Sequence, residues 1–365
     1  MRPLKFIISG GGTGGHIFPA IAIADELRNR HPDCDILFIG AKDRMEMEKV
    51  PRAGYPIEGL WISGIQRSLS AKNLIFPLKL LSSLAKARKI IKKFKPDVVI
   101  GVGGYASAAV LRMAIVAKIP TLIQEQNSFP GITNKWLAPK VNTICVAFEG
   151  LGKYFPKEKI VLTGNPVREK VVDIQGKREK GFDFFNLKKD VPTLLITGGS
   201  LGARSVNQNI LNGLNDLVAS GMQILWQTGK PFYNDADKGA KYLDDVKVHE
   251  FIYEMDLAYA VADMVVARAG AITVSELCIV QKPAILVPLP TAAEDHQTKN
   301  AMALVNKDAA IIIPDKDAGR LLVNRVIALM GDKQRKATLH DNLKSLGQRN
   351  AACKIADEVI KLVSR

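Results

Sequence analysis

The chain has 365 residues, of which 47% are hydrophobic and 24% charged; these values favour two domains and exclude a globally disordered protein. The formal net charge is +15 at pH 7, and residues 1–160 contain 24 Lys and Arg against 12 Asp and Glu. A positive excess in one half of a chain favours a polyanionic partner, which is a nucleic acid, an anionic lipid surface or a phosphorylated substrate.

Short β-branched runs alternate with amphipathic segments along the chain, which is typical of parallel sheets covered by helices. Two series of strands are predicted, at 4–10, 35–40, 97–104, 120–126, 142–148 and 159–167, and at 192–200, 222–229, 246–252, 262–270, 283–290 and 309–314. They predict an α/β fold with two doubly wound Rossmann-like domains that face a cleft. We expect domains at 1–163 and 164–345 and a C-terminal helix within 346–365.

Each series begins with a strand that runs into a glycine-rich turn, "GGGTGG" at 10–15 and "TGGSLGARS" at 197–205. Backbone N–H groups at such a turn, followed by a helix N-terminus, bind phosphate. An NAD site also requires an Asp or Glu after the second strand, where this chain reads Gly-Ala-Lys at 40–42. The pattern disfavours NAD and favours a nucleotide-sugar transferase, with the donor in one domain and the acceptor in the other.

His16 directly follows the first glycine turn and is the best candidate for chemistry. An inverting transfer by single displacement removes a proton from the acceptor hydroxyl as it attacks, and a histidine titrates in the right range to accept it. The sequence leaves open whether His16 takes the proton or orients the substrate.

The segment from Lys72 to Lys95 contains eight basic residues and no acidic one. A helix ending before Pro96 would carry an apolar stripe, part of which is core, whereas "NLIFPLK" just before it is the better lipid-facing segment. We expect contact with an anionic membrane surface through Lys72, Leu74, Ile75, Phe76 and Lys79.

Neither metal nor disulfide chemistry is indicated. The cysteines at positions 34, 145, 278 and 353 have no ligand spacing, and the Asp-x-Asp matches at 33–35 and 235–237 fit solvated loops better than Mg²⁺ sites. We expect no cofactor and no metal. The N-terminus lacks a signal-peptide pattern and no run reaches the roughly 20 apolar residues of a spanning helix, so a cytoplasmic location is expected.

Seven motifs occur in a characteristic order: "GGGTGGHIFPAIAIA", "GVGGYASAA", "QEQNSFPGITNKWLA", "TGNPVR", "TGGSLGARSVN", "RAGAITVSEL" and "AAEDHQTKNA". Together they resemble the peptidoglycan N-acetylglucosaminyltransferases. The resemblance spans residues 9 to 301 and implies the two-domain, metal-independent GT-B fold. It implies transfer of N-acetylglucosamine from UDP-N-acetylglucosamine to undecaprenyl-diphosphoryl-N-acetylmuramoyl-pentapeptide (lipid I), giving lipid II. A peripheral position at the cytoplasmic face of the inner membrane is also implied.

The resemblance also implies roles for individual residues. Glu276, one turn into a helix that begins after Gly270, would accept hydrogen bonds from the ribose; its alternative role is to stabilise the helix dipole. The other residues implied in binding UDP-N-acetylglucosamine are Thr13, Gly14, Gly15, Asn127, Arg168, Ser200, Ile252, Ala271, Ile272, Thr273, Val274, Ser275 and Gln297. Those implied for the acceptor diphosphate are Gly103, Gly104, Tyr105 and Asn134.

Rival functions remain at this stage. A transferase acting on another lipid, such as diacylglycerol, and a UDP-N-acetylglucosamine epimerase would use the same fold. A basic nucleic-acid-binding protein would need aromatic or Arg-rich reading motifs, yet only 6% of the residues are aromatic. We therefore expect UDP-N-acetylglucosamine, lipid I and an anionic membrane as partners, and no nucleic acid.

Overall fold

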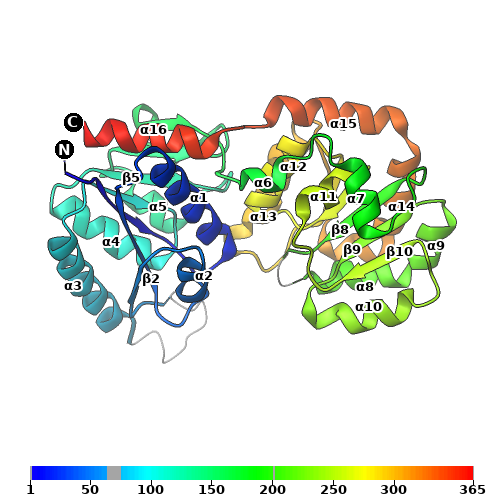
Figure 1. Ribbon diagram of the computed structural model, residues 1–365, viewed down its shortest axis with the longest axis horizontal. Coiled ribbons are helices and arrows are strands. Elements are labelled where there is room, and N and C mark those ends of the chain that lie inside the picture. The colour runs from blue at the N-terminus through cyan, green and yellow to red at the C-terminus, as the bar shows by residue number, and fades with distance from the viewer. Residues whose placement is uncertain (1, 64–74, 200–201, 365) are drawn as a thin grey trace. The chain divides into compact units, whose positions relative to one another are not determined.

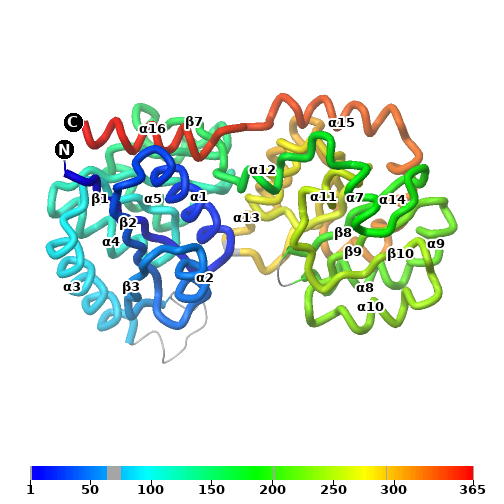
Figure 2. The backbone as a smooth tube through the Cα atoms, viewed as in Figure 1, coloured from blue at the N-terminus to red at the C-terminus, as the bar shows by residue number. Residues whose placement is uncertain are grey.

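The computed structural model describes residues 2–63, 75–199 and 202–364 (Figure 1). The chain divides into two compact units. Unit 1 combines residues 1–167 with 349–365, and unit 2 comprises residues 168–348. The division therefore follows Val167, and the last helix belongs to unit 1. In Figure 2 that red C-terminal helix runs beside the blue N-terminal part of the chain.

The sheet of unit 1 is parallel in every pair, with the strand order β3-β2-β1-β4-β5-β6-β7. One strand, β3, was missing from the sequence prediction, because its four residues at the sheet edge form no β-branched run. The strands are β1 (Lys5–Ser9), β2 (Asp35–Ala41), β3 (Ile57–Leu60), β4 (Val98–Gly101), β5 (Thr121–Glu125), β6 (Thr143–Val146) and β7 (Ile160–Leu162).

Helices cover both faces of this sheet, because side chains along a strand alternate between the faces. Phe6 and Ile8 of β1 pack against one group of helices, whereas Ile7 packs against the other, and all three are fully buried. The first group is α1 (Gly14–Arg30), α2 (Glu46–Arg52) and α16 (Ala351–Val363), and the second is α3 (Phe76–Phe94), α4 (Tyr105–Val116) and α5 (Ile132–Leu137).

Unit 2 repeats this plan with the parallel order β10-β9-β8-β11-β12-β13. The strands are β8 (Thr193–Thr197), β9 (Gln223–Gln227), β10 (Val246–His249), β11 (Met264–Ala267), β12 (Ala284–Leu286) and β13 (Ile311–Ile312). The helices are α6 (Glu169–Val172), α7 (Arg178–Phe185), α8 (Arg204–Asn212), α9 (Leu214–Ala219), α10 (Tyr233–Ala240), α11 (Met255–Val261), α12 (Ala271–Val280), α13 (His296–Val305), α14 (Ala318–Gly331) and α15 (Lys333–Leu346). The two-domain α/β fold predicted from the sequence is confirmed.

The strand order places the glycine turns where ligands bind in such sheets. Each order reverses direction at its centre, between β1 and β4 in unit 1 and between β8 and β11 in unit 2. Ligands of doubly wound sheets bind beyond the carboxyl ends of the strands at this switch point. The turns at 10–13 and 102–104 follow β1 and β4, and the glycine-containing segments at 198–199 and 268–270 follow β8 and β11.

Candidate active site

The first glycine turn of unit 1 presents a helix N-terminus to solvent. Thr13 is the extended N-cap residue of α1, and its carbonyl accepts hydrogen bonds from the N–H groups of His16 and Ile17. The amides of Thr13, Gly14 and Gly15 lie before the first point at which an α-helix supplies a carbonyl partner. Such amides and the helix dipole suit an anionic group.

The second turn of unit 1 packs directly against the first. Gly103 and Gly104 have φ angles of +100° and +88°, which favour glycine. A Cβ atom on Gly104 would lie 2.7 Å from the carbonyl oxygen of Gly11, and one on Gly103 would lie 2.8 Å from Nε2 of His16. The structure therefore brings His16 against this turn, and Tyr105 begins α4 immediately after it.

A buried carboxylate organises the next loop of unit 1. Glu125, at the end of β5, accepts hydrogen bonds from the backbone and side chain of Asn127 at 3.0 and 3.2 Å, from Gly131 N–H at 3.1 Å and from Asn134 Nδ2 at 2.8 Å. Burial raises the pKa of Glu125, and these four hydrogen bonds oppose that rise. Asn134 is only 3% exposed, so in this structure it supports the loop; its expected contact with the acceptor stays a prediction.

In unit 2, α12 presents the residues expected to hold the diphosphate and ribose. Gly270 is its extended N-cap, and the amides of 271–273 lie in its first turn. Ser275 donates its hydroxyl proton to the Ala271 carbonyl at 3.0 Å, so this side chain is already engaged within the helix. The backbone at this turn suits an anion.

Glu276 lies one turn into α12 and has two neighbours that favour its charged form. The hydroxyl of Tyr259, a residue only 1% exposed, donates a hydrogen bond of 3.0 Å to Oε2 of Glu276. Burial raises the pKa of Glu276 to about 7, while the Tyr259 hydrogen bond and the charge of Arg168 act in the opposite direction. Arg168, the N-cap residue of α6, is thus close enough to influence Glu276 electrostatically.

The side chain of Gln227 joins three segments at the carboxyl end of the second sheet. Its Nε2 donates to Thr197 Oγ1 at 3.2 Å and to the Gly199 carbonyl at 3.1 Å, and its Oε1 accepts from Ile252 N–H at 2.9 Å. The amide of Ile252 is therefore occupied within the protein. A uracil contact by the backbone of this residue stays a prediction.

Gln297 is the second residue of α13, and its Oε1 accepts a hydrogen bond of 2.9 Å from Leu289 N–H. Because of this bond, the Oε1 end of the side-chain amide faces the loop after β12, and the NH₂ group points away from Leu289 N–H. Glu294 and Asp295 precede α13 with φ angles of 52° and 55°, a left-handed conformation that costs roughly 1–2 kcal/mol per residue.

Comparison with known proteins identifies the two units. The model of the glycosyltransferase family 28 N-terminal domain matches residues 6–146, and that of the family's C-terminal domain matches residues 193–359. The chain belongs to glycosyltransferase family 28. This family 28 glycosyltransferase has full-length relatives, and the N-acetylglucosaminyltransferase resemblance seen in its motifs is confirmed by them.

Two curated relatives carry the name UDP-N-acetylglucosamine--N-acetylmuramyl-(pentapeptide) pyrophosphoryl-undecaprenol N-acetylglucosamine transferase. The relative from Flavobacterium psychrophilum is 53% identical to this glycosyltransferase over the whole chain and 99% of the relative. The relative from Parabacteroides distasonis is 51% identical over the full length of both proteins. The crystal structure of Acinetobacter baumannii MurG is 28% identical with a TM-score of 0.80, covering 98% of this chain and all of that one. A UDP-N-acetylglucosamine 2-epimerase, at 13% identity and a TM-score of 0.64, shares the fold alone; 98% of this chain and 96% of that one are covered.

The expected membrane segment of the glycosyltransferase is only partly described. Lys72 and Leu74 lie outside the described residues, as does Ser200 in the glycine-rich motif at 197–205. Ile75 is exposed, Phe76 is half-buried, and Lys79 donates to Ser63 Oγ at 3.0 Å. Leu78 and Leu81 on α3 are also exposed. On the same helix Ala87 and Ile91 are buried in the core, and Leu80, Leu84 and Phe94 are partly buried against it. Searched over its described parts, the glycosyltransferase has no helix long and apolar enough to cross a bilayer.

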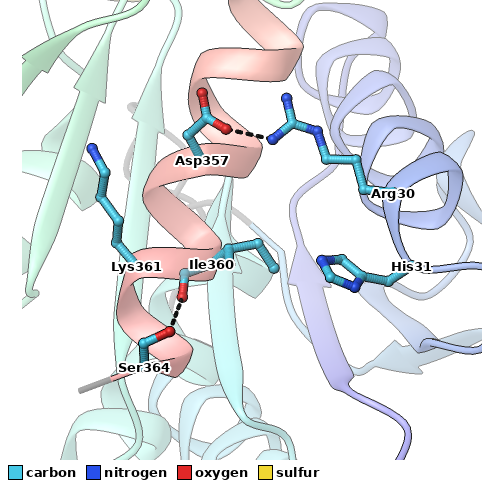
Figure 3. A pocket seen from close by; sticks show the side chains of 6 residues that line it. All are labelled: Arg30, His31, Asp357, Ile360, Lys361 and Ser364. Carbon is cyan, nitrogen blue, oxygen red and sulfur yellow. Dashed lines mark hydrogen bonds and ion pairs between the residues drawn. The ribbon is translucent and has the colours of Figure 1, made fainter.

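A surface cavity of about 620 Å³ lies elsewhere on unit 1, between the end of α1 and α16 (Figure 3). It is lined by Arg30, His31, Asp357, Ile360, Lys361 and Ser364, none of which the sequence predicted as a site residue. Its charges are already paired, Arg30 with Asp357 and with Glu26, and Lys361 with Glu358. This cavity therefore lies at the contact between two packed helices and is not part of the candidate active site.

Sequence reasoning missed four polar residues of the glycosyltransferase: Glu46, Glu125, Gln227 and Tyr259. Each is nearly fully buried and hydrogen-bonded to a turn or side chain of the site. For Glu125 and Gln227 a signal existed, because each is a polar residue at the carboxyl end of a fully buried strand. Within the described segments, no group of three His, Cys, Asp or Glu side chains could hold a metal ion. The expectation of metal-independent transfer stays a prediction.

Proposed function

We propose that this glycosyltransferase transfers N-acetylglucosamine from UDP-N-acetylglucosamine to lipid I, producing lipid II for peptidoglycan synthesis. The observation that carries the proposal is the sequence identity of 53% and 51%, over the full chain, to two relatives that are named for this reaction. The arrangement of the two sheets supports it, because each unit has glycine turns of the kind that bind phosphate at its switch point.

Unit 2 binds the donor in this proposal. The first-turn amides of α12 hold the diphosphate, together with Arg168, whose planar guanidinium suits phosphate oxygens. Glu276 accepts hydrogen bonds from the ribose hydroxyls, and Tyr259 fixes the carboxylate for this task. The loop that contains Ile252 meets the uracil, and Gln297 binds the sugar.

Unit 1 binds the acceptor, with its diphosphate at the turn formed by 103–105. The resemblance implies that residues 13–15 bind UDP-N-acetylglucosamine; we assign them to the acceptor diphosphate instead, because the first turn packs directly against 103–104. The acceptor hydroxyl attacks the anomeric carbon as the bond from that carbon to UDP breaks, which inverts the configuration. His16 takes the hydroxyl proton or orients the hydroxyl, since its ring lies against Gly103 between the two turns. The departing UDP is stabilised by the helix N-terminus and Arg168.

An anionic membrane surface brings the enzyme to its lipid acceptor in this proposal. On α3, the exposed side chains Leu78 and Leu81 near its start are followed by Arg88, Lys89 and Lys92, which are exposed as well. Each basic residue near such a surface contributes about 1 kcal/mol. Apolar side chains beside basic ones suit docking at the interface without a spanning helix.

The decisive experiment supplies purified enzyme with radiolabelled UDP-N-acetylglucosamine and lipid I in detergent, and separates the lipid products. Formation of labelled lipid II supports the proposal. Labelled product from diacylglycerol but not from lipid I would replace it with another lipid acceptor. Isomerisation of the donor without any acceptor would instead indicate an epimerase.

A further inference from the structure

Glu46, the first residue of α2, places a buried carboxylate beneath the first glycine turn. Its side chain is 1% exposed, and both of its oxygens are hydrogen-bonded to backbone N–H groups. Oε2 accepts from Gly12 at 2.9 Å, and Oε1 accepts from Ala41, at the end of β2, at 3.0 Å. The carboxylate therefore bridges the carboxyl ends of two neighbouring strands, β1 and β2.

Two glycines leave the space that this carboxylate occupies. A Cβ atom on Gly11 would lie 2.1 Å from Oε1 of Glu46, and a Cβ atom on Gly40 would lie 2.5 Å from its Cγ. Real Cβ contacts are never this short, so any side chain at either position would displace Glu46. These two glycines thus accommodate a side chain of the protein, whereas sequence analysis attributed the turn's glycines to phosphate.

The position of the first turn also determines that of its neighbours. The Gly11 carbonyl lies against Gly104, and the ring of His16 lies against Gly103. Interiors packed this closely transmit small displacements instead of absorbing them. A shift of residues 11–12 would therefore move both glycine turns and the imidazole of His16.

Glu46 also limits which amides an anion can use. The Gly12 N–H is occupied by the carboxylate, and the negative charge of Glu46 repels a phosphate from that side of the turn. An anion is thereby directed to the amides of residues 13–15, next to His16.

We propose that Glu46 is a positioning residue for the acceptor: it holds the first glycine turn so that the diphosphate and His16 are correctly placed for transfer. This inference rests on the proposed function, and in particular on acceptor binding by unit 1. It assigns Glu46 no contact with either substrate.

The first test is Glu46→Gln, which retains the shape of the side chain but directs an NH₂ group at one of two N–H donors. We expect kcat/KM for lipid I to fall about 100-fold, the loss that a misplacement of about 1 Å can produce. The Kd for UDP, measured by calorimetry, should stay within about twofold, because Arg168, Glu276 and the first turn of α12, which are proposed to hold UDP, lie in unit 2. A tenfold change in this Kd would correspond to about 1.4 kcal/mol. Glu48→Gln, an exposed position on the same helix, is the matched control.

A second variant, Gly40→Ala, displaces the Glu46 side chain without changing any hydrogen-bonding group or any residue of the glycine turn. It should show the same loss with lipid I and the same unchanged UDP binding. Thermal unfolding shows whether Glu46→Gln folds. If that variant does not fold, Gly40→Ala tests the role of Glu46 by itself. A purely structural role would instead reduce the active fraction, lowering UDP binding stoichiometry and turnover in parallel.

The outcomes separate this inference from the function on which it rests. Wild-type kcat/KM for lipid I in the folded variants, or a parallel loss of UDP binding and turnover, overturns the role of Glu46 alone. An inactive wild-type enzyme with lipid I overturns the proposed function instead. Selective loss of lipid I turnover in Gly40→Ala, with Glu48→Gln unaffected, supports the inference.

Discussion

Replacement of Tyr259 by Phe tests how the protein keeps the Glu276 carboxylate charged. The substitution removes only the hydroxyl that donates a hydrogen bond of 3.0 Å to Oε2 of Glu276. A hydrogen bond to a charged group is worth about 1.5–3 kcal/mol, which corresponds to about one to two pKa units. Since the pKa of Glu276 is already raised to about 7, we expect it to rise to about 8–9 in the variant.

The consequence is a pH-dependent loss of donor binding. At pH 7 about half of Glu276 is ionised in the wild type, against about 1–10% in the variant. If the ionised form holds the ribose, UDP affinity at pH 7 should fall about 5- to 50-fold and recover to within about twofold at pH 9. In the wild type, affinity should weaken as the pH falls below about 7, because protonation removes the charge that strengthens the ribose hydrogen bonds.

The assay is isothermal titration calorimetry with UDP between pH 6 and 9. Measuring each variant and the wild type in the same buffers cancels the titration of UDP itself. Tyr242→Phe is the control, because Tyr242 is 86% exposed in the same unit. The reasoning is refuted if Tyr259→Phe and the wild type lose affinity at the same pH, or if wild-type affinity does not change across this range.

Three further changes test the remaining roles. Glu276→Ala should weaken UDP binding about 10- to 100-fold, the equivalent of about 1.5–3 kcal/mol, and unchanged affinity in calorimetry would contradict ribose binding by this residue. His16→Ala should lower kcat for lipid I more than it changes the donor KM, since a base or orienter acts mainly in the transition state; near-normal turnover would leave His16 a structural role. Changing Arg88, Lys89 and Lys92 together to Glu should abolish co-sedimentation with phosphatidylglycerol vesicles at low salt, and wild-type binding should itself weaken as salt rises. Equal sedimentation of the two proteins would exclude docking through α3.

Much of the fold and part of the candidate site can be read from local sequence. Strands such as 5–9 and 193–197 are apolar runs that end in glycine-rich turns, so their type and the helix that follows are determined by neighbouring residues. The same holds for His16, which follows the first turn, and for Glu276, which lies one turn after Gly270. Such features are predictable because hydrophobic periodicity and the conformational freedom of glycine act over only a few residues.

Tertiary structure alone decided which side chains support these turns. Glu46 bonds to Gly12 across 34 positions of sequence, and Tyr259 reaches Glu276 across 17. The amphipathic pattern of α16 predicts a helix but not the unit that it covers, and its return to unit 1 is visible only in its packing with α1. A buried hydrogen bond or an apolar contact depends on where two segments meet in space, and the path of the chain between them leaves no local pattern at either end.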